Sequence, residues 1–262
     1  MTAGCLKGER YIMHRILRSI AVFSVFAGAI SLGAQTANDI LARHVTAVGG
    51  KDVISQVKSI SMETTTHAGE NDIPGTMVIL DGVASRTEMA INGAVVVQCF
   101  TAKGGWMVNP MAGITVPTPM PDDQYLAGKS QIYVGGDLHD YAALGNKLEL
   151  LSKDANTYTV KLTTKDNIES TYVFDAATYL VKSIARKGKF QNQDVIVTTN
   201  LSDYRKTDIG LVVPFAFSVD FGGQFSLSVT VNKAEINKAV DPDICAMPKA
   251  SPPPVAGKSA PN

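Results

Sequence analysis

The stretch from Leu211 to Asn232 constrains this fold more than any other feature, because apolar and polar residues alternate along it with a strict period of two. The apolar residues keep one parity on both sides of a Gly-Gly break: Phe215, Phe217, Val219, Phe221, Phe225, Leu227, Val229 and Val231. Such alternation is typical of strands with one buried face. It predicts two antiparallel strands with one aromatic-rich face and one face of serine and threonine.

The break at Gly222-Gly223 also predicts how these strands pair. A two-residue turn would set Phe221 opposite Gln224 and mix apolar and polar side chains on one face. A three-residue loop, 222–224, with a left-handed glycine keeps all the apolar side chains together. We expect the second arrangement. It gives the pairs Phe221–Phe225, Val219–Leu227 and Phe217–Val229.

The N-terminal residues 1–34 have the features of a signal peptide, with residues 1–12 as an upstream extension. Basic residues precede the apolar run 19–34, which ends in small residues and is short for a membrane span. We expect cleavage after Ala34. Because Gln35 follows instead of an acylatable cysteine, we expect a soluble exported protein without a lipid anchor. The alternative is an uncleaved, retained anchor.

The composition suits one globular domain, which we expect over residues 35–248. The chain has 262 residues, zero formal net charge and 45% hydrophobic residues. It lacks a basic run with interleaved aromatics, so we expect no nucleic-acid partner. The proline-rich residues 249–262 predict a disordered tail. Cys99 and Cys245 either form a disulfide in an oxidising compartment or remain buried thiols, and the sequence leaves both open.

Turn signals place the first half of the domain in sequential antiparallel strands. Helical spacing predicts a helix over 36–48, capped by Thr36 or Asn38. Asp81-Gly82 and Asn92-Gly93 each lie between strand-like runs and favour tight hairpins. These runs follow each other without helical crossovers, which indicates a meander.

The segment 111–145 interrupts the strands. Its VPTPMP run predicts a loop, because prolines cannot donate to a strand ladder. Residues 121–134 predict a helix, with acidic residues at its start. The apolar face of this predicted lid helix carries Tyr125, Leu126, Ile132 and Tyr133.

Strands resume after the lid, and their aromatic residues again fall on one face. A three-residue loop with a left-handed Asn167 sets Tyr158 opposite Phe174. The next loop, 175–178, then predicts Phe174 opposite Tyr179 and Tyr172 opposite Val181. Together these patterns predict about ten or eleven strands. The expected class is mainly β with a helical lid (α+β), in which helices cover a highly curved antiparallel sheet or half-closed β-barrel.

The sequence offers no arrangement of residues suited to catalysis. The histidines are scattered, and we find no motif for a zinc enzyme, a nucleophile elbow, a nucleotide site or a redox dithiol. We therefore expect no enzyme activity, no catalytic residues, no metal and no cofactor. The candidates for lining a hydrophobic cavity are Trp106, Tyr172, Phe174, Phe215, Phe217, Phe221, Phe225 and Leu227.

Several segments in succession resemble the periplasmic outer-membrane lipoprotein-sorting proteins, the LolA/LolB-like carriers. They are ANDILARHVTAVGGKDVISQVKSI, CFTAKGGWMVNP, DLHDYAALGNKLELL, YVFDAATYLVKSI, SDYRKTDIGLVVPFAF and VNKAEINKAVDPDICAMP. The resemblance implies a half-closed barrel whose concave face accepts acyl chains beneath helices. It also implies an arginine on an early strand that holds the lid shut, which Arg86 matches.

The leading hypothesis is a monomeric carrier of a lipid or lipoprotein acyl chain, with an inner-membrane donor or an outer-membrane acceptor as further partners. The alternative is a non-enzymatic envelope-assembly or structural module, whose concave face is filled by its own side chains or by a partner. A third hypothesis, a hydrolase of lipid-like substrates, lacks a nameable nucleophile and base.

Overall fold

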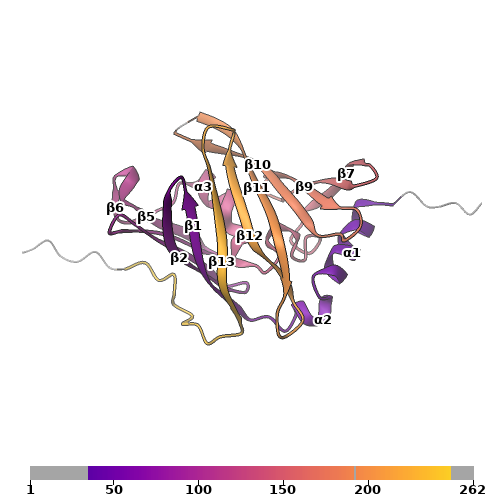
Figure 1. The fold of residues 1–262 in the computed structure, drawn as a ribbon, viewed down its shortest axis with the longest axis horizontal. Coiled ribbons are helices and arrows are strands. Elements are labelled where there is room, and N and C mark those ends of the chain that lie inside the picture. The colour runs from indigo at the N-terminus through magenta and orange to yellow at the C-terminus, as the bar shows by residue number, and fades with distance from the viewer. Residues whose placement is uncertain (1–34, 192, 249–262) are drawn as a thin grey trace, which may run out of the picture. The chain divides into compact units, whose positions relative to one another are not determined.

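A computed structural model describes residues 35–191 and 193–248, and within them one antiparallel sheet of 13 strands curls without closing (Figure 1). The strand order is β6-β5-β4-β3-β2-β1-β13-β12-β11-β10-β9-β8-β7. The early strands are β1 (Ser59–Ala68), β2 (Asn71–Leu80), β3 (Ala84–Ile91), β4 (Ala94–Thr101), β5 (Gly104–Asn109) and β6 (Ile114–Pro119). The late strands are β7 (Lys147–Lys153), β8 (Thr157–Thr163), β9 (Glu169–Asp175), β10 (Val181–Phe190), β11 (Gln193–Lys206), β12 (Val212–Phe221) and β13 (Ser226–Ile236). The predicted fold class is confirmed, whereas the signal peptide and the C-terminal tail lie outside the described residues.

The connection from β6 to β7 is the one long link in this topology. Strands β6 and β7 form opposite edges of the sheet, so the chain between them has to cross from one edge to the other. We call residues 121–146 the lid segment. It contains α3 (Asp122–Gly128) and the 3₁₀ turns η2 (Lys129–Ile132) and η3 (Gly136–Leu138). Another 3₁₀ turn, η1 (Pro110–Ala112), precedes β6.

The predicted pairing of the β12–β13 hairpin is confirmed. Val219 lies opposite Leu227, and Phe217 lies opposite Val229. At the turn, the Phe221 amide donates to the Phe225 carbonyl over 2.8 Å. Both turn glycines have positive φ, which residues without a side chain adopt readily. The pattern of apolar residues and the turn chemistry therefore agree on one register.

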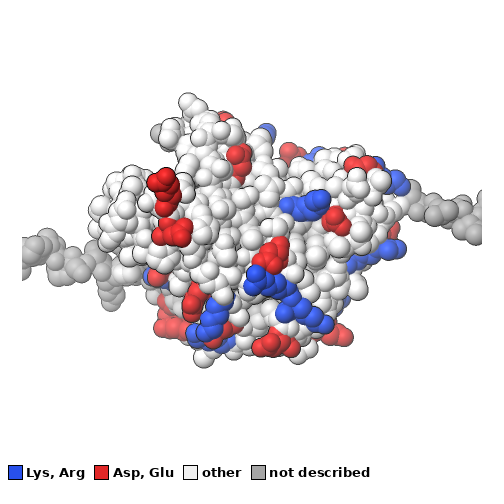
Figure 2. Space-filling model, in the orientation of Figure 1, with Lys and Arg blue, Asp and Glu red and all other residues white. Residues whose placement is uncertain are grey.

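The opposite face of this hairpin is polar, as the alternation predicts. Ser218 and Ser228 lie directly opposite each other on it. Figure 2 shows that the surface over the upper parts of β1, β13 and β12 carries few charged side chains. Uncharged hydroxyl groups therefore provide much of the solvated surface of these central strands.

Two sequence predictions about strands are wrong. The VPTPMP run was expected as a loop, but Pro117 and Pro119 belong to β6. β6 is an edge strand that forms hydrogen bonds with β5 alone. A proline is tolerated on such a strand, because the missing N–H can face the unpaired side. This strand contributes to the total of 13, which exceeds the expected ten or eleven.

The second wrong prediction is the register between β9 and β10. Tyr158 does lie opposite Phe174, and Asn167 does have a positive φ of 61°. However, Phe174 pairs with Val181 instead of Tyr179, and Tyr172 pairs with Ile184. Tyr179 itself takes a left-handed φ of 59°, which lengthens the turn, and a bulge follows in β10.

The N-terminal helix forms as predicted. In α1 (Ala37–Ala47), Thr36 and Asp39 make a reciprocal capping box. The buried side of α1 packs Ile40 and Leu41 against the late strands. A short helix, α2 (Lys51–Ile54), follows. The lid helix, in contrast, was expected over 121–134 but ends at Gly128 and continues as 3₁₀ turns.

The described residues contain no helix long and apolar enough to cross a bilayer.

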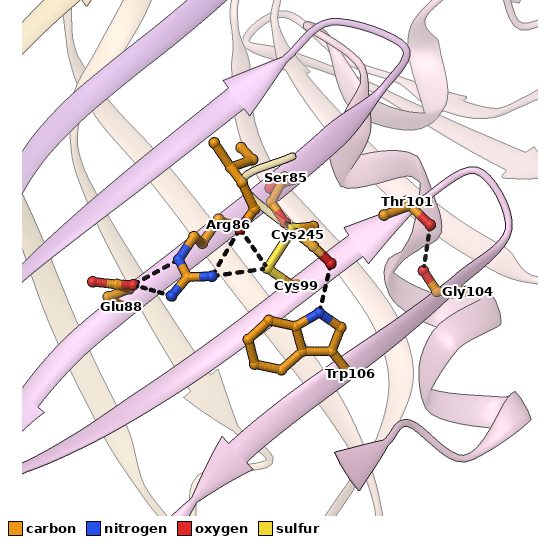
Figure 3. Close-up of a disulfide and its surroundings, with 9 residues drawn as sticks. Ser85, Arg86, Glu88, Cys99, Thr101, Gly104, Trp106 and Cys245 are labelled. Atoms are coloured by element: carbon orange, nitrogen blue, oxygen red, sulfur yellow. Dashed lines mark hydrogen bonds and ion pairs between the residues drawn. A yellow bond between two sulfur atoms is a disulfide. The ribbon is translucent and has the colours of Figure 1, made fainter. Parts of the chain in front are cut away.

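The C-terminal segment is fastened to the early strands by a disulfide, which answers the question that the sequence left open (Figure 3). Cys99 on β4 is joined to Cys245, with Cα atoms 5.5 Å apart. Beside the disulfide, the indole nitrogen of Trp106 donates to the Cys245 carbonyl over 2.7 Å. Arg86 donates to the Ile244 carbonyl over 2.8 Å, and its guanidinium lies 5.5 Å from the Trp106 ring. We call this group the C-terminal clamp.

The clamp predicts a measurable loss of stability on removing the disulfide. The Cys99–Cys245 bond spans 146 positions. In the chain-entropy model, opening so long a loop lowers the free energy of unfolding by about 5 kcal/mol. We expect this loss for Cys245→Ser in urea denaturation followed by Trp106 fluorescence, because Trp106 is the single tryptophan. Reduced wild-type protein is the control and should match the variant; an unchanged midpoint in both would contradict the prediction.

Candidate ligand-binding site

The strand pairings sort the candidate residues onto two faces of the sheet. Tyr172, Ile184, Thr199, Val219 and Leu227 lie opposite one another in turn across β9 to β13 and share one face. The pairing continues through β1 to β4 and puts Phe100 on the same face. We call this the inner face, because the helices α1 and α3 pack on it.

The inner face is covered at both ends by the protein's own side chains. At the late strands, α1 buries Tyr172 and Phe174, which are only 3% and 1% exposed. At the early strands, the lid segment places Ile132 and Tyr125 against Phe100. These two clusters are packed core and leave little room for a ligand.

Between the two covered ends, the inner face remains open to solvent in part. Phe217, Phe221 and Leu227 are half-buried, and Phe225 is 41% exposed. Phe190, on the neighbouring β10–β11 hairpin, lies 5.3 Å from Phe221 and 5.9 Å from Phe225 between ring centroids. The three phenylalanines form an aromatic cluster at the hairpin tips. Phe215, lower on β12, packs instead with the residues around Val57.

A cleft of about 1220 Å³ lies between the lid helix α3 and the β10–β11 hairpin. Its walls combine apolar residues, among them Met111 and Phe190, with charged residues at the rim. One ion pair, Lys189 with Asp123 at 3.2 Å, links β10 to α3 across the cleft. The cleft is therefore closed in part by a contact between exposed, solvated groups.

The lid segment is held to the late strands by a partly buried arginine, Arg186 on β10. Its guanidinium donates to the Ala127 carbonyl over 2.6 Å and to the Asp137 carboxylate over 2.9 Å. Both partners belong to the lid segment. Tyr172 donates a longer hydrogen bond to Asp137, and burial raises the pKa of Tyr172, so its hydroxyl stays protonated. A second ion pair, Lys129 with Asp166, also joins the lid to the late strands.

Arg186 was not found from the sequence, and two predicted site residues lie elsewhere. Arg86, the expected lid arginine, and Trp106, a cavity candidate, are both on the outer face in the C-terminal clamp. Both residues lie on early strands, as expected. Their side chains are on the face of the sheet opposite to the one that carries Phe100. The lid contact comes from a late strand, and no pattern around Arg186 signals it.

The other predicted lid residues belong to the segment expected. Tyr125 donates to the Thr101 carbonyl over 3.0 Å, and Ile132 is 2% exposed. Tyr133 stacks on His139 with ring centroids 4.7 Å apart. Leu126 is half-buried. Most of these contacts join the lid to the early strands, whereas Arg186 joins it to the late strands.

A second, smaller cavity of about 270 Å³ lies between α1, α2 and residues 134–140. His44 lines it and donates from Nδ1 to the Tyr179 carbonyl over 2.9 Å, because a carbonyl only accepts. Burial lowers the pKa of His44, so the ring is neutral near neutral pH. Among residues 35–191 and 193–248, no group of three or more His, Cys, Asp and Glu side chains has the arrangement of a metal site.

Comparison with known proteins identifies the fold. The structure resembles a LolA superfamily protein from Nitrosomonas europaea with a TM-score of 0.54 and 12% identity, over 82% of this chain and 98% of that one. It also resembles a domain assigned to an outer membrane lipoprotein-sorting protein from Vibrio parahaemolyticus, with a TM-score of 0.52 and 8% identity over 78% and 95% of the chains. A DUF1329 family protein from Desulfovibrio piger matches with a TM-score of 0.52 and 12% identity over 81% and 99%.

These similarities show that the chain has a LolA-like fold, as the resemblance of its segments implies. Protein-family models give no match to the sequence, and no curated protein matches it. The likeness therefore lies in the three-dimensional arrangement.

The packing of Gly128 against Phe100 predicts a variant that displaces the lid. A Cβ at Gly128 would lie 2.4 Å from the Phe100 ring, closer than side chains tolerate. We expect Gly128→Ala to loosen the lid and increase the fluorescence of a hydrophobic dye such as ANS bound to the inner face. Gly104→Ala is the matched control, because its Cβ meets nothing within 4 Å. Equal dye binding by both variants and the wild type would show that this contact does not hold the lid.

Proposed function

We propose that this chain is an exported carrier that shields a lipid or lipoprotein acyl chain on its inner face. The observation that carries the proposal is the aromatic cluster of Phe190, Phe221 and Phe225, which is only half covered and borders a cleft of about 1220 Å³. Exposed aromatic surface of this kind next to a cleft is typical of a binding site for an apolar ligand.

The energetics of such a ligand favour this surface. Removing an acyl chain from water gains about 0.8 kcal/mol per buried CH₂ group, so a carrier needs apolar walls more than hydrogen bonds. It also needs a cover that opens without unfolding the core. The lid segment fits this need, because Arg186, Lys129 and Lys189 join it to the late strands through polar contacts.

The proposal extends to the cellular setting of the protein. The apolar run 19–34 supports export, and Gln35 after it supports a soluble periplasmic form. A LolA-like fold agrees with this setting, since one structural relative is assigned to outer-membrane lipoprotein sorting. We propose an inner-membrane donor or an outer-membrane acceptor as partners of a monomer, with no catalytic residue and no cofactor.

A second candidate is a structural or envelope-assembly module. Its support is that both ends of the inner face are already filled, by α1 over Phe174 and by the lid over Phe100. In that case the aromatic cluster would contact a partner protein, and the isolated chain would take up no lipid.

Substitutions on the hairpin distinguish the two candidates. A carboxylate placed on the inner face should repel an acyl chain, because burial of an unpaired charge is costly. We therefore expect Phe217→Asp and Phe225→Asp each to abolish binding of a fluorescent fatty acid. Ser228→Asp is the matched control on the outer face of the same hairpin and should bind like the wild type.

Circular dichroism confirms that each variant is folded before its binding is compared. Retained binding in folded Phe217→Asp and Phe225→Asp would remove this hairpin from the site. Absence of binding in the wild type would favour the assembly module.

A further inference from the structure

A small polar group lies on the inner face around Arg186 of β10. Arg186 on β10 and Ser170 on β9 are directly opposite each other in the sheet, and Tyr172 is the next residue of β9 on the same face. The Asp137 carboxylate from the lid completes the group and is 7% exposed. We call these four residues the inner polar group.

Two features indicate that the hydrogen bonds of this group are incomplete or depend on the lid. Ser170 is 1% exposed, and its hydroxyl oxygen finds no hydrogen-bond partner in the described part of the chain. Buried hydroxyls in folded proteins nearly always form a hydrogen bond, so the unpaired Ser170 hydroxyl is available to bind a ligand atom. In addition, both hydrogen-bond acceptors of Arg186, the Ala127 carbonyl and the Asp137 carboxylate, belong to the lid segment.

Opening of the lid therefore removes both acceptors of Arg186 and exposes its guanidinium to water. A ligand that covers this guanidinium again must bring an anion, because burial of an unpaired charge is costly. Arginine presents its donors in a planar fork that matches the oxygens of a carboxylate or a phosphate. A ligand that brings such oxygens would replace Asp137 and would also give the Ser170 hydroxyl an acceptor.

The inner polar group lies close to the cleft and to the aromatic cluster. Gly188, two residues beyond Arg186 on the same strand face, lines the cleft, and so does Phe190. Four residues of β-strand place Phe190 about 13 Å from Arg186 along β10. A hydrocarbon chain spans this distance easily, so one molecule can reach both places.

We propose that the ligand is an anionic amphiphile, whose carboxylate or phosphate group binds Arg186 and Ser170 in place of Asp137 while its acyl chain lies along the aromatic cluster. This inference rests on the proposed carrier function and specifies its ligand class. Asp137 then acts as an internal substitute for the headgroup, which keeps Arg186 paired while the site is empty.

The test uses two fluorescent probes that differ only in charge, cis-parinaric acid and its methyl ester, titrated into the purified mature protein. A charge-assisted hydrogen bond contributes enough that we expect the acid to bind at least about tenfold more tightly than the ester. Arg186→Met should remove this preference, so that acid and ester bind the variant with equal affinity. Lys182→Met is the matched control, because it removes an exposed charge from the same strand.

A second variant keeps the test independent of the stability of Arg186→Met. Asp137→Asn removes the competing carboxylate at nearly constant shape, and we expect it to increase the ratio of acid affinity to ester affinity above that of the wild type. A purely structural lid contact predicts instead that both probes respond equally. Competition with palmitate and with lysophosphatidic acid shows which anionic headgroup is preferred.

The outcomes separate the two proposals. If acid and ester bind equally to the wild type and to every variant, the headgroup assignment is overturned while the carrier function stands. If neither probe binds the wild type, the carrier function itself fails. If inorganic phosphate alone displaces the acid, the inner polar group is a site for a free anion and the amphiphile proposal is overturned.

Discussion

The structure depends on one constraint: an unclosed, curled sheet with an apolar inner face has to keep that face out of water. The topology supplies the cover, because β6 and β7 are opposite edges of the sheet and the chain between them has to cross over. The lid segment 121–146 is thus a consequence of strand order. Together with α1 it covers both ends of the inner face and leaves the aromatic cluster around Phe225 half open.

The two faces of the sheet carry segments that are attached in physically different ways. On the outer face, the Cys99–Cys245 disulfide and the Trp106 indole fix the C-terminal segment through a covalent bond and a buried hydrogen bond. On the inner face, the lid meets the late strands through the Arg186 contacts and two ion pairs. The lid packs on the early strands through apolar side chains around Phe100 and meets the late strands through polar contacts. This arrangement is suited to uptake and release, because the late-strand side of the lid can open without unfolding the core.

Local patterns were enough to predict most of this fold. Strict alternation and a Gly-Gly turn determine the β12–β13 register, since a shift of one residue would expose every apolar side chain. The β9–β10 register failed because the left-handed Tyr179 lengthens its turn without a sequence signal. β6 was missed because prolines exclude a central strand but not an edge strand.

The candidate site was harder to predict, because face and partner are properties of the assembled sheet. Trp106 and Phe100 lie on adjacent strands, and only their pairing shows that they face opposite sides. The role of Arg186 depends on Ala127 and Asp137, which are separated from it by 59 and 49 positions. The resemblance to lipoprotein-sorting proteins implied Arg86 as a lid arginine, but Arg86 contacts the Ile244 carbonyl in the C-terminal clamp.

The most direct test of the central claim is native mass spectrometry of the mature protein purified gently from its native envelope, followed by organic extraction. The account predicts a discrete added mass that extracts as lipid. A clean ligand-free mass, together with no uptake of added lipid, would contradict it.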